Sequence, residues 1–255
     1  MAFQRALWVK SLTKNSAPAW PCPSCRKGSL QLRKDTLLFH ETAESKQAHS
    51  EDWWEPEYID LVFTCWLRCS LSTCQQDVAV SGVGGIEEYY VYDENGDPDT
   101  NYDEYFHPAF VRPMPDIFNI PEKCPKEIAE QLRGAFALFW QDEAAAASRV
   151  RVALEDLMGH LNVKKRRKEA NGKIKTLTLH QRLEIYQSID SVIAPQLMAV
   201  KWLGNTGSHT SAVTRDDLLD AFEILDHALA ELIEQRSKKM IALAKKMTKT
   251  HRPRR

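Results

Sequence analysis

Two closely spaced pairs of cysteines constrain the N-terminal part of this 255-residue chain more than any other feature. Cys22 and Cys25 are separated by two residues, and Cys69 and Cys74 by four. A short turn between two cysteines can direct both thiolates at one ion, and zinc favours four such ligands in a tetrahedron. We therefore expect Cys22, Cys25, Cys69 and Cys74 to hold a structural zinc ion, with no coordination position left open for catalysis.

The sequence also allows other ligand sets. Cys65 and Cys69 form an alternative second pair, but Cys65 lies in a β-prone run, where a free cysteine packs as a small apolar side chain. His40 or His49 is the alternative to one thiolate. Five of the six cysteines precede residue 75, a distribution that favours metal over a disulfide framework. The chain also has neither an apolar run of about 18–20 residues nor a secretory signal, so we expect a cytoplasmic protein without a membrane partner.

The composition changes along the chain and predicts an α+β protein with two domains. Residues 1–106 carry β-prone runs at 29–39, 58–67 and 78–83, the last ending at Gly84-Gly85, and an acidic, turn-rich loop at 93–104. We interpret them as a small zinc-ribbon-like β domain. Residues 107–125 contain five prolines and predict an extended linker. Residues 126–255 predict an all-α helical bundle.

Helical periodicity supports the second domain. Apolar residues recur at helical spacing from Ile128 onward, and a basic loop at 164–175 interrupts the pattern. A short helix with Pro195 in its first turn is expected to stop at Gly204. Thr214, followed three residues later by Asp217, predicts a capping box that opens a last helix reaching about residue 247.

Charge is unevenly distributed in a chain whose formal net charge is −1. The basic loop contains a run of five cations, and residues 236–255 form a second basic tract. Such clusters neutralise phosphates and add salt-dependent affinity for DNA or RNA. Within a dimer, the acidic 93–104 loop is an alternative partner for these cations. The candidate nucleic-acid-binding residues are Lys164, Lys165, Arg166, Arg167 and Lys168.

Four stretches together resemble a known family: WPCPSC, LRCSLSTCQQDVAVSG, the run from IPEKCPKE to ALEDLM, and KWLGNTGSH. They resemble bacterial proteins in which a zinc ribbon precedes the domain of unknown function 4145. That domain is similar to the HEPN group of helical domains and occurs in restriction and phage-defence proteins. The resemblance implies a HEPN-like bundle and a homodimer.

HEPN ribonucleases carry an arginine followed four to six residues later by a histidine. Asn205 and His209 fit this pattern, but Gly204 stands where the arginine is expected. RNA cleavage needs a group that moves protons, a task for histidine, and a cation on the phosphate, a task for arginine. Arg149, Arg151 and Arg182 are candidates to supply that cation from neighbouring helices. A turn that only caps a helix is the alternative role for this segment, so the sequence does not decide whether the protein is an enzyme.

These observations lead to three hypotheses. The first is a nucleic-acid-associated zinc-ribbon and HEPN-like module in bacterial phage defence or restriction. The second is a metal-independent ribonuclease that uses His209. The third is a scaffold that dimerises through apolar faces around Phe136, Phe139 and Trp140 while the ribbon binds a partner defence protein. No nucleotide-binding glycine loop or hydrolase nucleophile motif is visible.

Overall fold

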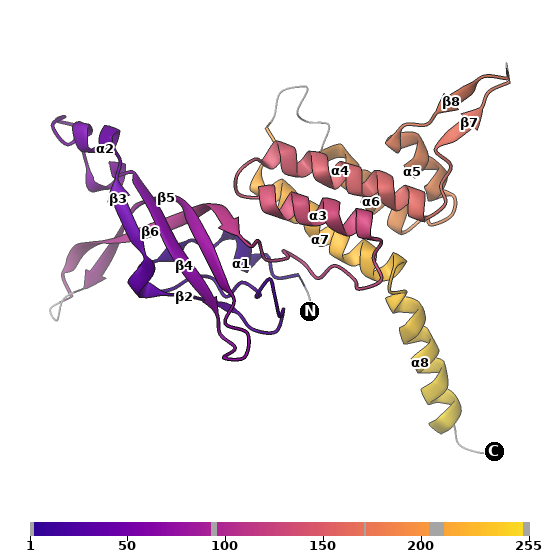
Figure 1. The fold of residues 1–255 in the computed structure, drawn as a ribbon, viewed down its shortest axis with the longest axis horizontal. Helices are drawn as coiled ribbons and strands as arrows, with labels where there is room; N and C mark the ends of the chain where they lie inside the picture. Colours follow the sequence, from indigo (N-terminus) through magenta and orange to yellow (C-terminus); the bar gives the residue numbers. More distant parts are fainter. Residues whose placement is uncertain (1–2, 93–95, 171, 204–211, 252–255) are drawn as a thin grey trace. The chain divides into compact units, whose positions relative to one another are not determined.

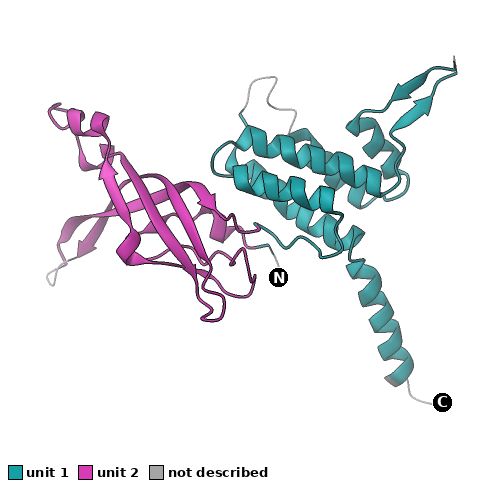
Figure 2. Cartoon of the chain, in the orientation of Figure 1, with its two compact units in different colours: residues 1–3, 117–255 teal, residues 4–116 magenta. Residues whose placement is uncertain are grey.

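The chain folds as an N-terminal, curled antiparallel sheet followed by a region of several helices (Figure 1). The structure is a computed structural model and describes residues 3–92, 96–170, 172–203 and 212–251. Two compact units are present (Figure 2). Gln4–Asp116 form the first, here called the sheet unit, and Ile117–Arg255 with Met1–Phe3 form the second, here called the helical unit.

The sheet unit is built around six strands in the order β1-β6-β5-β4-β2, with β3 pairing to β4. Side chains alternate between buried and exposed along β4, as expected for a strand with one face on a core. The inward residues of β4 pack with aromatic side chains of β3 and β6. The elements are α1 (Ala6–Val9), β1 (Leu12–Thr13), β2 (Leu30–Leu32), η1 (Lys34–Thr36), β3 (Leu38–Glu41), α2 (Ala43–Ala48), η2 (Pro56–Tyr58), β4 (Leu61–Cys69), β5 (Asp77–Tyr92) and β6 (Pro98–Arg112).

Three sequence-based expectations for this unit need correction. The strand predicted to end at Gly84-Gly85 continues to Tyr92, and a side chain at either glycine would collide with Tyr105 of the neighbouring strand. The segment predicted as an acidic loop instead contributes residues 98–104 to β6, which pair with residues 86–92 of β5. The sheet also has six strands among the described residues, where the sequence predicts three.

The predicted proline-rich linker is replaced largely by ordered structure. Its first part, residues 107–112, is the end of β6, and Pro108 is buried there beside a β-bulge. Its later part contributes Ile117, Phe118 and Ile120 to the core of the helical unit. The boundary between the two units therefore falls at Asp116, inside the segment expected to be extended.

The helical unit packs its helices around an aromatic centre. Phe136 lies 5.1 Å from Phe118 and 5.2 Å from Phe222 between ring centroids, both with edge-on geometry. The capping box predicted at Thr214 and Asp217 is confirmed. The elements are α3 (Lys126–Leu138), α4 (Glu143–His160), β7 (Arg166–Lys168), β8 (Ile174–Thr176), α5 (Leu179–Gln187), α6 (Ile193–Leu203), α7 (Arg215–Leu232) and α8 (Arg236–His251).

Two further expectations for the helical unit were wrong. The last helix is two helices, since the chain leaves helical geometry after α7 and Gln235 adopts a φ of 53°. Phe136, Phe139 and Trp140, expected to form a dimer face, are buried at 1%, 0% and 6% exposure. These rings form the core of the unit and offer no surface to a partner. Among the described residues, no helix is long and apolar enough to cross a membrane.

Candidate functional site

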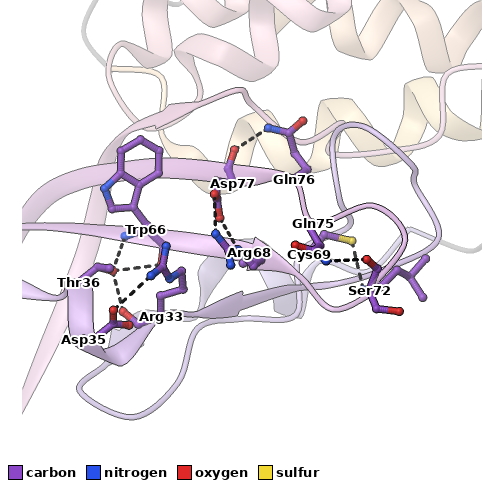
Figure 3. Close-up of polar contacts among 11 residues, drawn as sticks. Arg33, Asp35, Thr36, Trp66, Arg68, Cys69, Ser72, Gln75, Gln76 and Asp77 are labelled. Atoms are coloured by element: carbon purple, nitrogen blue, oxygen red, sulfur yellow. Dashed lines mark hydrogen bonds and ion pairs between the residues drawn. The ribbon is translucent and has the colours of Figure 1, made fainter.

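The structure brings the four predicted cysteines together at one end of the sheet unit. Cys22 and Cys25 lie in the turn that precedes β2, whereas Cys69 ends β4 and Cys74 lies in the turn that leads to β5 (Figure 3 shows this end of β4). Leu30 of β2 pairs directly with Cys69, so the sheet itself aligns the two turns. The four side chains therefore meet although more than forty residues separate the two turns in sequence.

The sulfur positions have the dimensions of a metal centre. All four Sγ atoms lie within 4.8 Å of one another. The Cys22–Cys74 and Cys25–Cys69 Sγ distances are both 3.7 Å. A tetrahedral ion with metal–sulfur bonds of about 2.3 Å requires sulfur–sulfur distances of about 3.8 Å. The four residues can hold a metal ion, and all six cysteines, which lie in the described part of the chain, are free thiols.

Both turns have the same local design. The residue after the second cysteine has a positive φ in each, 56° at Arg26 and 49° at Gln75. This left-handed step turns the chain back toward the sheet and leaves backbone N–H groups facing the sulfurs. Gly28 N–H donates to Cys25 Sγ at 3.4 Å. A side chain at Gly28 would collide with the Cys69 sulfur, so this glycine allows the two turns to approach each other.

Hydrogen bonding and burial act in opposite directions on the thiols. Backbone N–H groups of Gly28 and Lys27 lower the pKa of Cys25 to about 6. Burial raises the pKa of Cys69 to about 12. Thiolates are the species that bind metal, and a bound cation deprotonates a coordinating thiol. The centre thus combines one sulfur that is readily ionised with a buried one whose charge requires a cation.

The alternative ligands are elsewhere. Cys65 lies on β4 four residues before Cys69, which corresponds to about 13 Å of strand. Burial raises its pKa to about 12, as expected for a packed thiol without a cation. His49 is engaged by Glu41, with Nε2 and Oε1 2.6 Å apart. His40 lies on β3, and neither histidine belongs to the cysteine group.

Comparison with protein families assigns both halves of the chain. Residues 10–111 match a Domain of unknown function (DUF8608), and residues 133–250 match a Domain of unknown function (DUF4145). The chain carries a DUF4145 domain. The four cysteines all fall within the DUF8608 match. No curated protein and no solved structure shows significant similarity to the chain.

The basic loop of the DUF4145 domain is a two-stranded hairpin. Strands β7 and β8 pair antiparallel, and every described residue from 164 to 168 and from 172 to 176 is exposed. Residues 164–176 carry seven cations and one carboxylate, Glu169, which lies 4.0 Å from Lys175. Arg167 pairs directly across from Lys175. The structure therefore gathers Lys164, Lys165, Arg166, Arg167 and Lys168 on one projecting ribbon.

The candidate catalytic residues of the DUF4145 domain are only partly placed. Asn205 and His209 lie outside the described residues. Arg149 is exposed on α4 and donates to Gln131 Oε1 at 3.0 Å, and Arg151 lies two residues further along the same helix. Lys201, at the end of α6, is 4% exposed. Burial, followed by the positive charge of Arg151, lowers the pKa of Lys201.

Two structural features escaped sequence reasoning. The hairpin has no alternating apolar pattern, so its strands were not predicted, although the flanking residues Val163 and Leu177 are apolar and buried. Arg182 was considered only as a substitute catalytic cation. It is instead buried and donates to the carbonyl oxygens of Glu155 and Val163, at 3.0 Å and 3.1 Å. Its guanidinium therefore satisfies backbone groups around the end of α4.

Proposed function

We propose that this protein binds nucleic acid through the β7–β8 hairpin and that a structural zinc ion holds the sheet unit together. The observation that supports this proposal is the concentration of seven cations on one exposed, two-stranded ribbon in a chain of net charge −1. Phosphate backbones are the common biological ligands that neutralise such a surface, and the affinity they provide depends steeply on salt.

The pairing of the strands makes the hairpin more specific than a random basic patch. Arg167 and Lys175 are cross-strand neighbours. Like charges in that position destabilise a ribbon by up to about 1 kcal/mol. A phosphate beside this pair would remove the repulsion. A two-stranded ribbon also fits the major groove of B-DNA, which is about 12 Å wide. Duplex DNA is accordingly the ligand that this geometry favours.

Fluorescence anisotropy with a labelled 20-base-pair duplex tests the proposal. The double variant Lys165→Glu/Arg167→Glu should weaken binding, and the slope of log affinity against log salt should fall by about 2, since each phosphate contact contributes about 0.9. The matched control is Lys123→Glu/Lys126→Glu, which makes the same change of charge on exposed lysines of the helical unit. Equal losses in the two variants, or binding by the native protein that does not respond to salt, would refute the hairpin as the interface.

Zinc is the metal we propose because four thiolates at tetrahedral spacing form the ligand set typical of structural zinc. Elemental analysis of the purified protein should find one zinc ion per chain. The variant Cys25→Ser/Cys74→Ser should lose it, whereas Cys65→Ala should retain it. Another metal in the native protein, or zinc retained by the double variant, would contradict this assignment.

We further propose phage defence or restriction as the biological setting, with a HEPN-like bundle in the DUF4145 domain. The resemblance described above is the support for this setting. Phages should form fewer plaques on cells that express the native protein than on cells that express the Lys165→Glu/Arg167→Glu variant. Equal plaque numbers across a panel of double-stranded DNA phages would count against defence and would leave the binding proposal to its own test.

A further inference from the structure

The sheet unit exposes an unusually apolar surface on the side of the sheet opposite its core. We call it the outer face and define it by the outward residues of β3, β4, β5 and β6. Five large apolar side chains on this face are between 46% and 62% exposed. Isolated apolar residues are normal on a surface, but five large ones on neighbouring strands of one face favour a binding site. The five are Leu38, Val62, Trp66, Val83 and Phe110.

Strand register places Trp66 of β4 and Phe110 of β6 on the outer face, with small residues of β5 between the two strands. Trp66 pairs with Ala79, which in turn pairs with Arg112. In the next outward row, Leu38 pairs with Thr64, Thr64 with Ser81, and Ser81 with Phe110. The residues between the rings are short, and Trp66 and Phe110 are 47% and 49% exposed. Flat ligands can therefore stack on both.

Two arginines share the outer face with the indole. Arg112 of β6 lies in the same cross-strand row as Trp66, two strands away. Arg68, the next outward residue of β4, is held by two bonds to Asp77 of 2.7 Å and 2.8 Å (Figure 3). These two bonds fix the orientation of the Arg68 guanidinium. Aromatic faces bordered by arginine are the usual platform for unstacked bases and their phosphates.

A hollow of about 490 Å³ continues the outer face at its other end. Val83 and His107, which are cross-strand partners, line it together with Tyr105. The Tyr105 and His107 rings are 5.1 Å apart between centroids. Carboxylates of Glu44 and Asp60 also line the hollow. They disfavour a phosphate there and can accept hydrogen bonds from the N–H groups of a base.

We infer that the outer face of the sheet unit binds single-stranded nucleic acid, with bases stacked on Trp66 and Phe110 and a further base in the hollow. The inference rests on the proposed function in taking nucleic acid as the ligand, but it names a second, separate surface. The alternation of aromatic rings, small residues and arginines distinguishes this face from a purely apolar protein interface, whose centre is depleted of charge.

Binding of fluorescein-labelled 15-nucleotide single strands to the metal-loaded full chain tests the inference. Separate DNA and RNA probes show which sugar is preferred. Trp66→Ala and Phe110→Ala should each weaken binding of the preferred strand by about 5- to 100-fold, the usual effect of removing one stacking partner. Both side chains are half exposed, so neither substitution opens a cavity in the core.

The matched control is Trp53→Ala, which removes an indole of the sheet unit that is 60% exposed but lies outside the outer face. It should leave single-strand affinity unchanged. Affinities of Trp66→Ala and Phe110→Ala equal to that of Trp53→Ala would overturn the inference, and so would a native protein that binds no single strand. A loss of duplex binding only in Lys165→Glu/Arg167→Glu would meanwhile uphold the hairpin, so the two proposals fail separately.

Discussion

Loss of the metal centre should destabilise the sheet unit and spare the helical unit. The perturbation is Cys25→Ser/Cys74→Ser, which removes one ligand from each turn. Both residues are only partly buried, so the core of the sheet is left intact. A bound ion would cross-link the two turns, and the shortest loop that it would close between them runs from Cys25 to Cys69.

The length of that loop sets the expected magnitude. Chain entropy for a closed loop of about 45 residues corresponds to about 4 kcal/mol at 25 °C. Domains of this size are stable by about 5–15 kcal/mol, so the loss is a large fraction of the total. It corresponds to a fall in the melting temperature of roughly 15–25 °C.

Two optical probes separate the units. Five of the seven tryptophans lie in the sheet unit, so tryptophan fluorescence reports mainly on it, whereas circular dichroism at 222 nm reports mainly on the helices. The fluorescence transition should move to lower temperature in the double variant, and the helical transition should stay in place. Cys65→Ala is the control, since it removes a thiol from the same sheet without removing a ligand. Melting of the double variant within a few degrees of this control would refute the cross-link argument.

Three further predictions concern single residues. Replacing Arg182 by leucine should lower the free energy of unfolding of the helical unit by about 2–4 kcal/mol, because buried carbonyl groups lose their donors; a urea titration that shows less than about 0.5 kcal/mol would contradict this. Arg68 holds the pKa of Asp77 below its ordinary value of 3.8. The contribution of this ion pair to stability is therefore present above about pH 4, and it is lost as the pH falls through the lower pKa that Asp77 has in the folded protein. The stability difference between the native protein and Asp77→Asn should therefore shrink between pH 5 and pH 2, and a constant difference would exclude the ion pair as its source. With a pKa of about 12, Cys65 should react with iodoacetamide at pH 8 only after unfolding, and labelling of the native protein at the rate of a free thiol, located by mass spectrometry, would show that Cys65 is accessible.

The cluster of four cysteines could be predicted from sequence because its information is local. Each pair of cysteines encodes its own turn, and the choice of Cys74 over Cys65 follows from the β-prone run around Cys65. The left-handed steps at Arg26 and Gln75 and the close approach at Gly28 could not be predicted, since they depend on how the two turns meet.

Two pairs of strands could not be predicted from the sequence, for the same physical reason. Residues 86–92 with 98–104, and residues 166–168 with 174–176, form paired strands whose side chains are mostly exposed on both faces. Period-two alternation arises only when one face of a strand is buried. Without it, charge and turn residues dominate the sequence pattern and predict a loop. The apolar spacing around Phe136 correctly predicts a helix, but periodicity alone does not distinguish a core from a dimer face.

The hairpin has a consequence for how this protein can diversify. Its base is closed by Val163 and Leu177, both buried, and by the Leu177 N–H bond to the carbonyl oxygen of Lys165 at 2.9 Å. All described residues between Lys164 and Thr176, except the half-buried Glu169, are solvent-exposed and add nothing to the packing of the helices. Related chains can therefore change the length or the charge of this hairpin without repacking the helices. Ligand preference can then evolve through about a dozen residues.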